Sequence, residues 1–410
     1  MESAHPSPRQ TLFRGQGPIL LISLGHGATH WLLGTFYIIL PFFTRELGIS
    51  YTQAGLLVAT LQVSSFLTNA AGGAVVDLSG RRMVFLVACL LMGGSAMVGV
   101  GFNNLFPAMV VLVVLLGISV SLWHAPAIAL ISGSFPDRRG YALSIHSTGA
   151  SLGDMVAPGI AGILLTVMSW HDAAVLSSAP AFLLALALPM LLRGAVMEPK
   201  ATGGGTRMGA RQYLLALRQL FRRMGMVGMC LMVALRGMAQ AGLTMFLPLY
   251  LADVMRVSPG MVGGTVLAMH LGAVVMSPIA GALSDRMGRR PVVRAGLFAT
   301  TIIIFALTLL DNTVLFVGGV SLLGFSLYAI RAVMQSWMID IFPQHLSGTA
   351  TSVFFALQAG FSAMIPLLGG LVADSFGLFY VFYLLAGIML LSNVMIFLIP
   401  KGIAREEEPA

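Results

Sequence analysis

Twelve long apolar stretches dominate this sequence and decide what it can fold into. A helix that crosses the hydrocarbon of a bilayer needs about 20 apolar residues, and every stretch reaches about that length. Only 9% of the residues are charged and 57% are hydrophobic, whereas soluble domains are about one quarter charged. We therefore expect an all-helical integral membrane protein. The stretches cover residues 17–43, 52–77, 83–102, 105–132, 139–168, 172–193, 225–252, 259–284, 291–310, 313–340, 347–373 and 377–400.

The same composition excludes several other classes of protein. Two cysteines, Cys89 and Cys230, are too few for a disulfide scaffold and lie inside apolar stretches. The net charge of +8 comes from scattered arginines without a basic face, so we expect no nucleic-acid partner. No phosphate-binding Gly-Lys-Ser/Thr loop is present, so ATP is not the motor. His26 and His30 have no acidic residue beside them in the sequence, so we expect no metal site, no cofactor and no enzyme activity.

One polar break between the apolar stretches is much longer than the others. It covers residues 194–224 and holds a run of three glycines followed by a basic amphipathic stretch. Arg211, Arg218 and Arg222 share one face of that stretch, which predicts a helix lying on the membrane surface. We therefore divide the chain into an N-terminal half (1–193), a cytoplasmic linker (194–224) and a C-terminal half (225–410).

The positive charges predict how the chain is oriented. If the N-terminus is cytoplasmic, 19 of the 23 lysines and arginines fall in cytoplasmic segments, and the outer loops hold Arg45 and Arg256. Short cytoplasmic loops carry the excess of lysine and arginine in membrane proteins. We therefore expect a multi-pass protein of the inner (plasma) membrane with both termini in the cytoplasm.

The two halves resemble each other at a fixed offset of 208 residues. The segment 73–82 (GAVVDLSGRR) aligns with 281–290 (GALSDRMGRR), and the same offset relates Pro158 to Pro366 and Gly162 to Gly370. Because six spans separate the copies, the two halves run parallel through the membrane. Parallel repeats of six helices are typical of carriers whose halves move about a central site.

The aligned segment carries a family resemblance. Its pattern, Gly-x-x-x-Asp-x-x-Gly-Arg-Arg, is similar to the best-known motif of the major facilitator superfamily, although Leu78 stands where that family usually has a basic residue. The resemblance implies a transporter of twelve transmembrane helices in two six-helix halves, working by alternating access. It also implies that charges in this motif open and close the cytoplasmic side, whereas anchoring at the lipid headgroups is the alternative. The gating candidates are Asp77, Arg81, Arg82, Asp285, Arg286 and Arg289.

A narrower resemblance lies in the first half. The segments 123–126 (WHAP), 135–140 (FPDRRG) and 142–154 (ALSIHSTGASLGD) look like the fosmidomycin-resistance branch of drug exporters. That resemblance implies efflux of small organic molecules, anionic or drug-like, in exchange for protons. The glycines around Pro158 are similar to an antiporter motif of the superfamily, with Ala157 in place of a glycine; tight helix packing is the alternative.

Charged side chains inside the spans point to a water-accessible passage. Each of Asp154, Arg236 and Arg331 would cost roughly 2.5–3.5 kcal/mol if it faced lipid at the bilayer centre. They must therefore face a cavity or each other; a static salt bridge between the halves is the alternative to a transport role. In the fold that the resemblance implies, spans 1, 4, 7 and 10 line the cavity. The substrate-binding candidates are His30, Trp123, His124, Arg236, Gln240, Tyr328, Arg331 and Gln335. The proton-coupling candidates are Asp154, His26 and His270, and a neutral hydrogen-bonded role is the alternative for each histidine.

These observations lead to one main functional hypothesis and two others. We expect a monomeric, proton-coupled antiporter that exports a small-molecule substrate through the lipid bilayer, driven by the proton gradient. Proton-coupled uptake of an anionic metabolite by symport on the same scaffold is the alternative. A membrane enzyme or a receptor is disfavoured, because no catalytic cluster and no large soluble domain is evident.

Overall fold

The computed structural model describes residues 16–192, 224–341 and 347–399. Within them, twelve helical segments are long and apolar enough to cross a membrane, which confirms the predicted fold class. The N-terminal half contains α2 (Gly17–Glu46), α3 (Tyr51–Ser79), α4 (Arg82–Phe102), α5 (Phe106–Leu122), α6 (His124–Ser134), η1 (Pro136–Arg138), α7 (Arg139–Val167), α8 (Trp170–Ser177) and α9 (Ala179–Leu191). The C-terminal half contains α11 (Met224–Leu249), η2 (Tyr250–Val254), α12 (Pro259–Met287), α13 (Arg289–Leu307), α14 (Thr313–Leu327), α15 (Ala329–Ile341), α16 (Ser347–Phe376), α17 (Leu378–Met395) and η4 (Ile396–Leu398).

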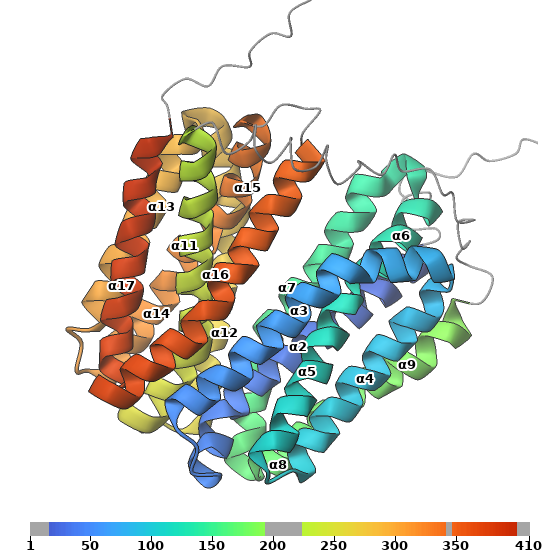
Figure 1. The fold of residues 1–410 in the computed structure, drawn as a ribbon, viewed down its shortest axis with the longest axis horizontal. Coiled ribbons are helices and arrows are strands. Elements are labelled where there is room, and N and C mark those ends of the chain that lie inside the picture. The colour runs from blue at the N-terminus through green and yellow to red at the C-terminus, as the bar shows by residue number, and fades with distance from the viewer. Residues whose placement is uncertain (1–15, 193–223, 342–346, 400–410) are drawn as a thin grey trace, which may run out of the picture.

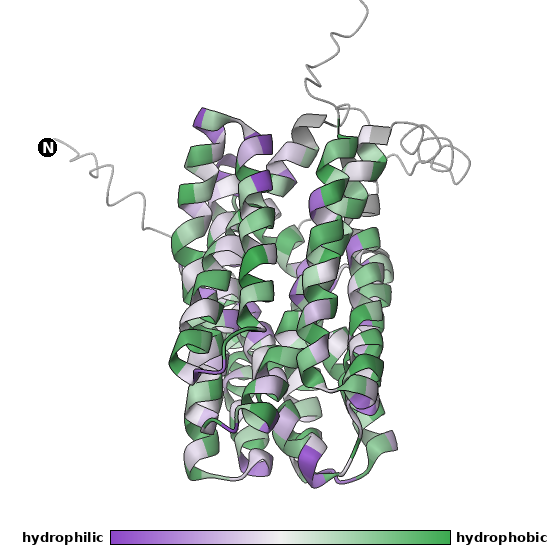
Figure 2. Ribbon diagram, turned by 90° about the vertical axis from the view of Figure 1, so that its left-hand side faces the viewer, coloured by the Kyte–Doolittle hydropathy of each residue, from purple (hydrophilic) through white to green (hydrophobic). Residues whose placement is uncertain are grey.

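The two halves form a V (Figure 1). They pack together at one end, where α2 passes into α3, and diverge at the other, where α6 ends (Figure 1). Large apolar side chains such as Leu183, Phe298 and Leu322 are exposed on the outer faces, and hydrophobic residues run along the length of the helices (Figure 2). A soluble protein rarely exposes so much apolar surface, so these faces are the ones that contact lipid.

The packing between the halves depends on glycines that lie against backbone carbonyls. A Cβ atom at Gly263 of α12 would collide with the carbonyl oxygen of Pro158 on α7, and one at Gly55 of α3 would collide with that of Pro366 on α16. Both pairs are related by the offset of 208 residues that the sequence repeat shows. Small residues allow helix backbones to approach this closely. The repeat therefore builds two equivalent crossings, α3 on α16 and α7 on α12, which hold the V together.

Polar contacts reinforce the end at which the halves meet, which we call the closed end. Arg45 at the end of α2 forms an ion pair with Asp253 in η2, and the Tyr51 hydroxyl donates to the same carboxylate at 3.1 Å. Asp374 of α16 accepts hydrogen bonds from the backbone N–H groups of Tyr51 and Thr52, at 2.9 and 2.8 Å. These N–H groups belong to the first turn of α3, which has no partners within its own helix. The C-terminal half thus caps a helix of the N-terminal half.

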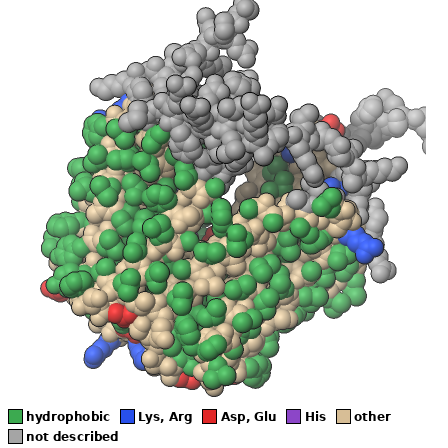
Figure 3. Space-filling view, viewed as in Figure 1, with side chains coloured by type: hydrophobic (Ala, Val, Ile, Leu, Met, Phe, Trp, Pro, Cys, Tyr) green, Lys and Arg blue, Asp and Glu red, His purple; other side chains and the backbone are tan. Residues whose placement is uncertain are grey.

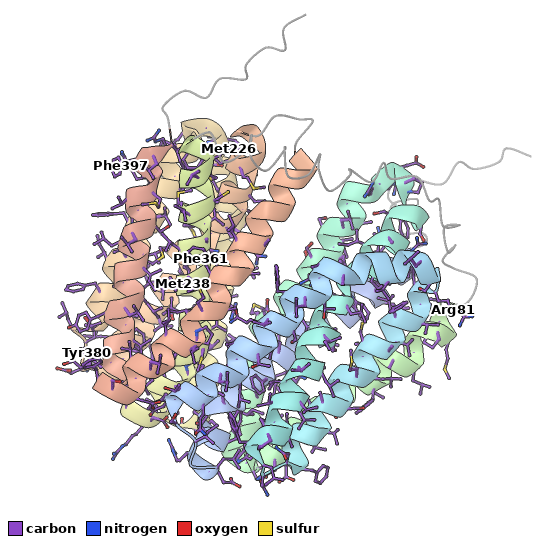
Figure 4. The ribbon with its side chains drawn as sticks, viewed as in Figure 1. Arg81, Met226, Met238, Phe361, Tyr380 and Phe397 are labelled. Carbon is purple, nitrogen blue, oxygen red and sulfur yellow. The ribbon has the colours of Figure 1, made fainter. Side chains whose placement is uncertain are left out.

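At the opposite end, which we call the open end, the C-terminal half forms contacts within itself. Arg289 pairs with Asp285 one turn away, and Arg290 donates to the carbonyls of Ile396 and Ile399. The surface is hollowed between the halves at this end (Figure 3). Arg81 lies at the margin of the N-terminal half that is away from the C-terminal half (Figure 4).

Of the gating candidates, Arg289 therefore forms an ion pair with Asp285 inside the C-terminal half. Arg82 is buried within the N-terminal half, and Arg286 is exposed at the end of α12. The side chain of Asp77 lies outside the described residues, as does the predicted amphipathic helix of the linker, residues 194–223. Their proposed roles stay predictions.

Replacing Gly263 by alanine should push the closed end apart. The added methyl group meets a backbone carbonyl that cannot rotate away, and overpacking of this kind costs about 1–3 kcal/mol. That cost shifts the balance away from the closed-end state by about 5- to 150-fold. Spin labels can be placed at Leu105 and Val314, which are both exposed near this end. The distance between the two labels should be long in a larger fraction of molecules than in the wild type.

Gly264→Ala is the matched control, because nothing lies within 4 Å of a Cβ atom at this neighbouring position. The glycine–carbonyl crossing would not control the closed end if the two alanine variants gave the same distance distribution.

Candidate functional site

A hydrogen-bonded pair lies inside the N-terminal half, between α2 and α7. Nδ1 of His30 lies 2.9 Å from Oδ1 of Asp154. An ionised carboxylate can only accept, so Nδ1 carries the hydrogen and donates it. The helices come close enough for this bond because Gly153, beside Asp154, packs directly against the Gly27 carbonyl and the His30 Cβ atom. The side chains of His30 and Asp154 remain 20% and 37% exposed, so neither is sealed off from water.

The pair faces charged and titratable groups of the other half. Asp154 lies within electrostatic reach of His270 on α12 and of Arg331 on α15. The structure thus brings together Asp154, His270 and Arg331, which the sequence analysis selected from three separate spans. The ring of His270 also lies 5.2 Å from that of Tyr328, at the junction of α14 and α15. This region, where both halves approach one carboxylate, is the candidate site.

Arg331 presents its guanidinium at the candidate site. Its side chain is exposed, as is that of Gln335 one turn further along α15. Tyr328 and Gln240 are half-buried. An exposed guanidinium beside polar side chains can bind a carboxylate or a phosphate through forked hydrogen bonds.

Arg236 has a different position from the one expected of a substrate ligand. Its side chain is only 1% exposed, and Nη2 and Nε donate to the carbonyl oxygen of Leu327, at 2.6 and 3.3 Å. Leu327 is the last residue of α14, and the final carbonyls of a helix lack partners within it. A positive charge is also favoured at this end of the helix dipole. Arg236 therefore stabilises the break between α14 and α15.

Trp123, another predicted substrate-binding residue, lies in the core instead. Its side chain is fully buried, at the junction between α5 and α6. The indole occupies the space that a side chain at position 25 would need, and Gly25 leaves that space free. In the described conformation Trp123 packs α6 against α2 and does not line the passage.

The remaining histidines of the N-terminal half surround His30. The ring of His26 lies 4.9 Å from that of His30 and 5.0 Å from that of His124. The ring of His146, on α7, stacks on His26 at 4.2 Å. His146 was not predicted as a site residue, because its position within an otherwise helical stretch gives no sign of what it faces.

Replacing Arg236 by methionine should destabilise the protein. The change removes the partner of a buried helix-terminal carbonyl, and such an unsatisfied group costs about 1–3 kcal/mol. We expect a lower midpoint of thermal unfolding in detergent. Arg331→Met, at an exposed arginine of the same half, is the control and should unfold near the wild-type temperature; an equal loss in both variants would contradict the role of Arg236.

Comparison with known proteins agrees with this architecture. The sequence matches the family model of the Major Facilitator Superfamily at residues 22–364 and again at 229–410. It is 22% identical to the phosphoglycerate transporter protein of Salmonella typhimurium, over 94% of this chain and 90% of that protein. It is 25% identical to the hexuronate transporter of Bacillus subtilis, over 90% of this chain and 91% of that protein.

A solved structure shows the same fold. It is that of a bacterial homolog of the human lysosomal transporter Spinster, in an inward-facing and unoccupied conformation. The TM-score is 0.79 at 15% identity, over 96% of this chain and 98% of that one.

Proposed function

We propose that this chain, which belongs to the Major Facilitator Superfamily, is a secondary active transporter that carries a small organic anion together with a proton. Proteins of this family are transporters and not enzymes, and the twelve apolar helices make the chain a multi-pass membrane protein. The observation that carries the proposal is the His30–Asp154 hydrogen bond, within electrostatic reach of Arg331.

The orientation follows from the arginines at the two ends of the helices. Arg138, Arg139 and Arg286 lie at the open end, whereas Arg45 and Arg256 lie at the closed end. The excess of positive charge is expected on the cytoplasmic side. The open end then faces the cytoplasm, the termini lie on that side of the inner membrane, and the V is an inward-facing state of alternating access. Parting the closed end and joining the open end would give the outward-facing state.

The charges at the candidate site favour transport of proton and anion in the same direction. While Asp154 is ionised, its negative charge offsets the attraction of Arg331 for an anionic substrate. A proton on the His30–Asp154 pair removes that offset, so proton and anion bind best together. Two relatives bear the names of anion carriers, a phosphoglycerate and a hexuronate transporter. This coupling favours uptake by symport, whereas the sequence alone favoured export by antiport.

Exchange of a proton for a drug-like cation is the second candidate function. Here the cation and the proton would compete for Asp154, which is the condition for antiport. The resemblance to the fosmidomycin-resistance exporters favours exchange and stays a prediction. Gly159, next to Pro158, packs against Leu267 of α12, so this part of the antiporter-like motif lies at the crossing between the halves.

Asp154→Asn should uncouple transport from the pH gradient. Asparagine keeps the size and hydrogen-bonding shape of aspartate but cannot exchange the proton. In proteoliposomes with acid outside, wild-type protein should accumulate an organic anion such as 3-phosphoglycerate or a hexuronate. The variant should fall to the level seen without a gradient, while exchange of labelled for unlabelled substrate continues.

Asp311→Asn, at an exposed aspartate in the loop before α14, is the control and should remain coupled. Full coupling in the Asp154 variant would remove the proton role of this residue. Expulsion of substrate under the acid-outside gradient would favour exchange over symport.

Arg331→Met should weaken binding of anions selectively. A hydrogen bond to a charged group contributes about 1.5–3 kcal/mol, so the loss corresponds to about 10- to 150-fold in affinity. Titration of purified protein with an organic anion and with a cationic dye measures both affinities. If the two ligands lost affinity equally, the anion site would not be at Arg331.

A further inference from the structure

Four histidines from three helices meet inside the N-terminal half, and we call them the histidine cluster. His26 and His30 lie one turn apart on α2, His124 begins α6, and His146 lies on α7. The ring centroids of His26 and the other three are separated by 4.2 to 5.0 Å. Rings so close together cannot all carry a positive charge at once, because like charges in a medium of low dielectric constant repel strongly. The proposed transport step uses only the His30–Asp154 pair and leaves the other three histidines unexplained.

Two of these rings are held in the tautomer that a metal ion needs. Nδ1 of His26 lies 3.0 Å from the carbonyl oxygen of His146, and Nδ1 of His30 lies 2.9 Å from the carboxylate of Asp154. A carbonyl oxygen and an ionised carboxylate only accept, so each Nδ1 then carries its hydrogen and each Nε2 is left with its lone pair. A metal-binding histidine nearly always donates its other N–H to a carbonyl or a carboxylate in this way.

The two lone pairs are buried without a partner. Nε2 of His26 and Nε2 of His30 have no hydrogen-bond partner among the described residues, and the His26 side chain is 95% buried. Buried polar atoms in proteins are nearly always paired. Leaving them unpaired costs free energy, which a ligand that accepts both lone pairs would remove.

A third ligand completes the site. One ligand nitrogen from each of His26, His30 and His124 can be chosen so that all three lie within 4.8 Å of one another. Tetrahedral zinc, with Zn–N bonds of about 2.1 Å, places its ligand nitrogens about 3.4 Å apart. Binding would require rotation of the side chains to close that difference, and a tetrahedral ion would then have a fourth position for water.

We propose that His26, His30 and His124 bind a divalent transition-metal ion of the Zn²⁺ class, with Asp154 orienting the His30 ring. Three neutral imidazoles suit Zn²⁺, Cu²⁺, Ni²⁺ and Co²⁺, and do not suit Mg²⁺ or Ca²⁺, which prefer oxygen ligands. The sequence analysis predicted no metal site, because no acidic residue stands near His26 and His30 along the chain. The fold overturns the premise of that prediction, since Asp154 joins them from α7. The inference does not rest on the proposed transport function, although both involve the His30–Asp154 pair.

The test is metal binding to the full-length protein, purified through a tag that contains no histidine. Calorimetric titration with Zn²⁺ should show one ion bound per chain, and Co²⁺ should give the visible absorption of a tetrahedral nitrogen site. His30→Gln and His124→Gln should abolish the Co²⁺ absorption. Asp154→Asn keeps all three ligands, and loss of such an orienting partner should weaken Zn²⁺ affinity by about 10- to 100-fold.

His171→Gln is the matched control. His171 lies on α8, pairs with Glu46 at 2.9 Å and belongs to no part of the cluster, so this variant should bind Zn²⁺ and Co²⁺ as the wild type does. Zn²⁺ should also raise the unfolding temperature of the wild type and of His171→Gln, but not that of His124→Gln. The site would be overturned by wild-type protein that binds no Zn²⁺ at micromolar concentration. It would equally be overturned by unchanged binding in His30→Gln and His124→Gln, or by loss of binding in His171→Gln.

Discussion

The cost of leaving a polar group unpaired inside a membrane protein shapes the interior of this one. Hydrocarbon offers no hydrogen bonds, so a buried donor or acceptor is stabilised by a partner within the protein. Arg236 finds the carbonyl that the break after Leu327 leaves open, and Asp154 finds the ring of His30. Each pairing crosses between helices, and each fixes a rotation of one helix against another. The charged residues that make the spans unusual are therefore also the residues that set their arrangement.

The glycine–carbonyl crossings provide the complementary constraint. Gly55 and Gly263 let α3 and α12 press against the backbones of α16 and α7 at the closed end. Arg45 and Asp253, which occupy equivalent positions in the two repeats, join the same end by an ion pair. Backbone contacts at glycines and an ion pair thus join the halves at this end. Such an interface suits a protein whose halves exchange their open and closed ends.

The spans and the repeat could be predicted from the sequence, because both depend on the order of residues along the chain. Apolar length marks a crossing helix, and the offset of 208 residues predicted which segments would be equivalent. Contacts between helices depend on how each one is rotated, which hydropathy does not reveal. His30 and Asp154 are 124 residues apart, and His146 reads as an ordinary helical residue until α7 is packed on α2. For the same reason Trp123 was expected in the passage and lies in the core.

His30 connects the two sites through its two nitrogens. While Asp154 is ionised, Nδ1 of His30 must donate to it, and the lone pair of Nε2 points into the histidine cluster. A protonated Asp154 can itself donate to Nδ1, and a neutral imidazole then carries its hydrogen on Nε2. That hydrogen occupies the position at which a metal ion would bind. At the proposed metal site, a protonated Asp154 that donates to Nδ1 therefore disfavours a metal ion on His30.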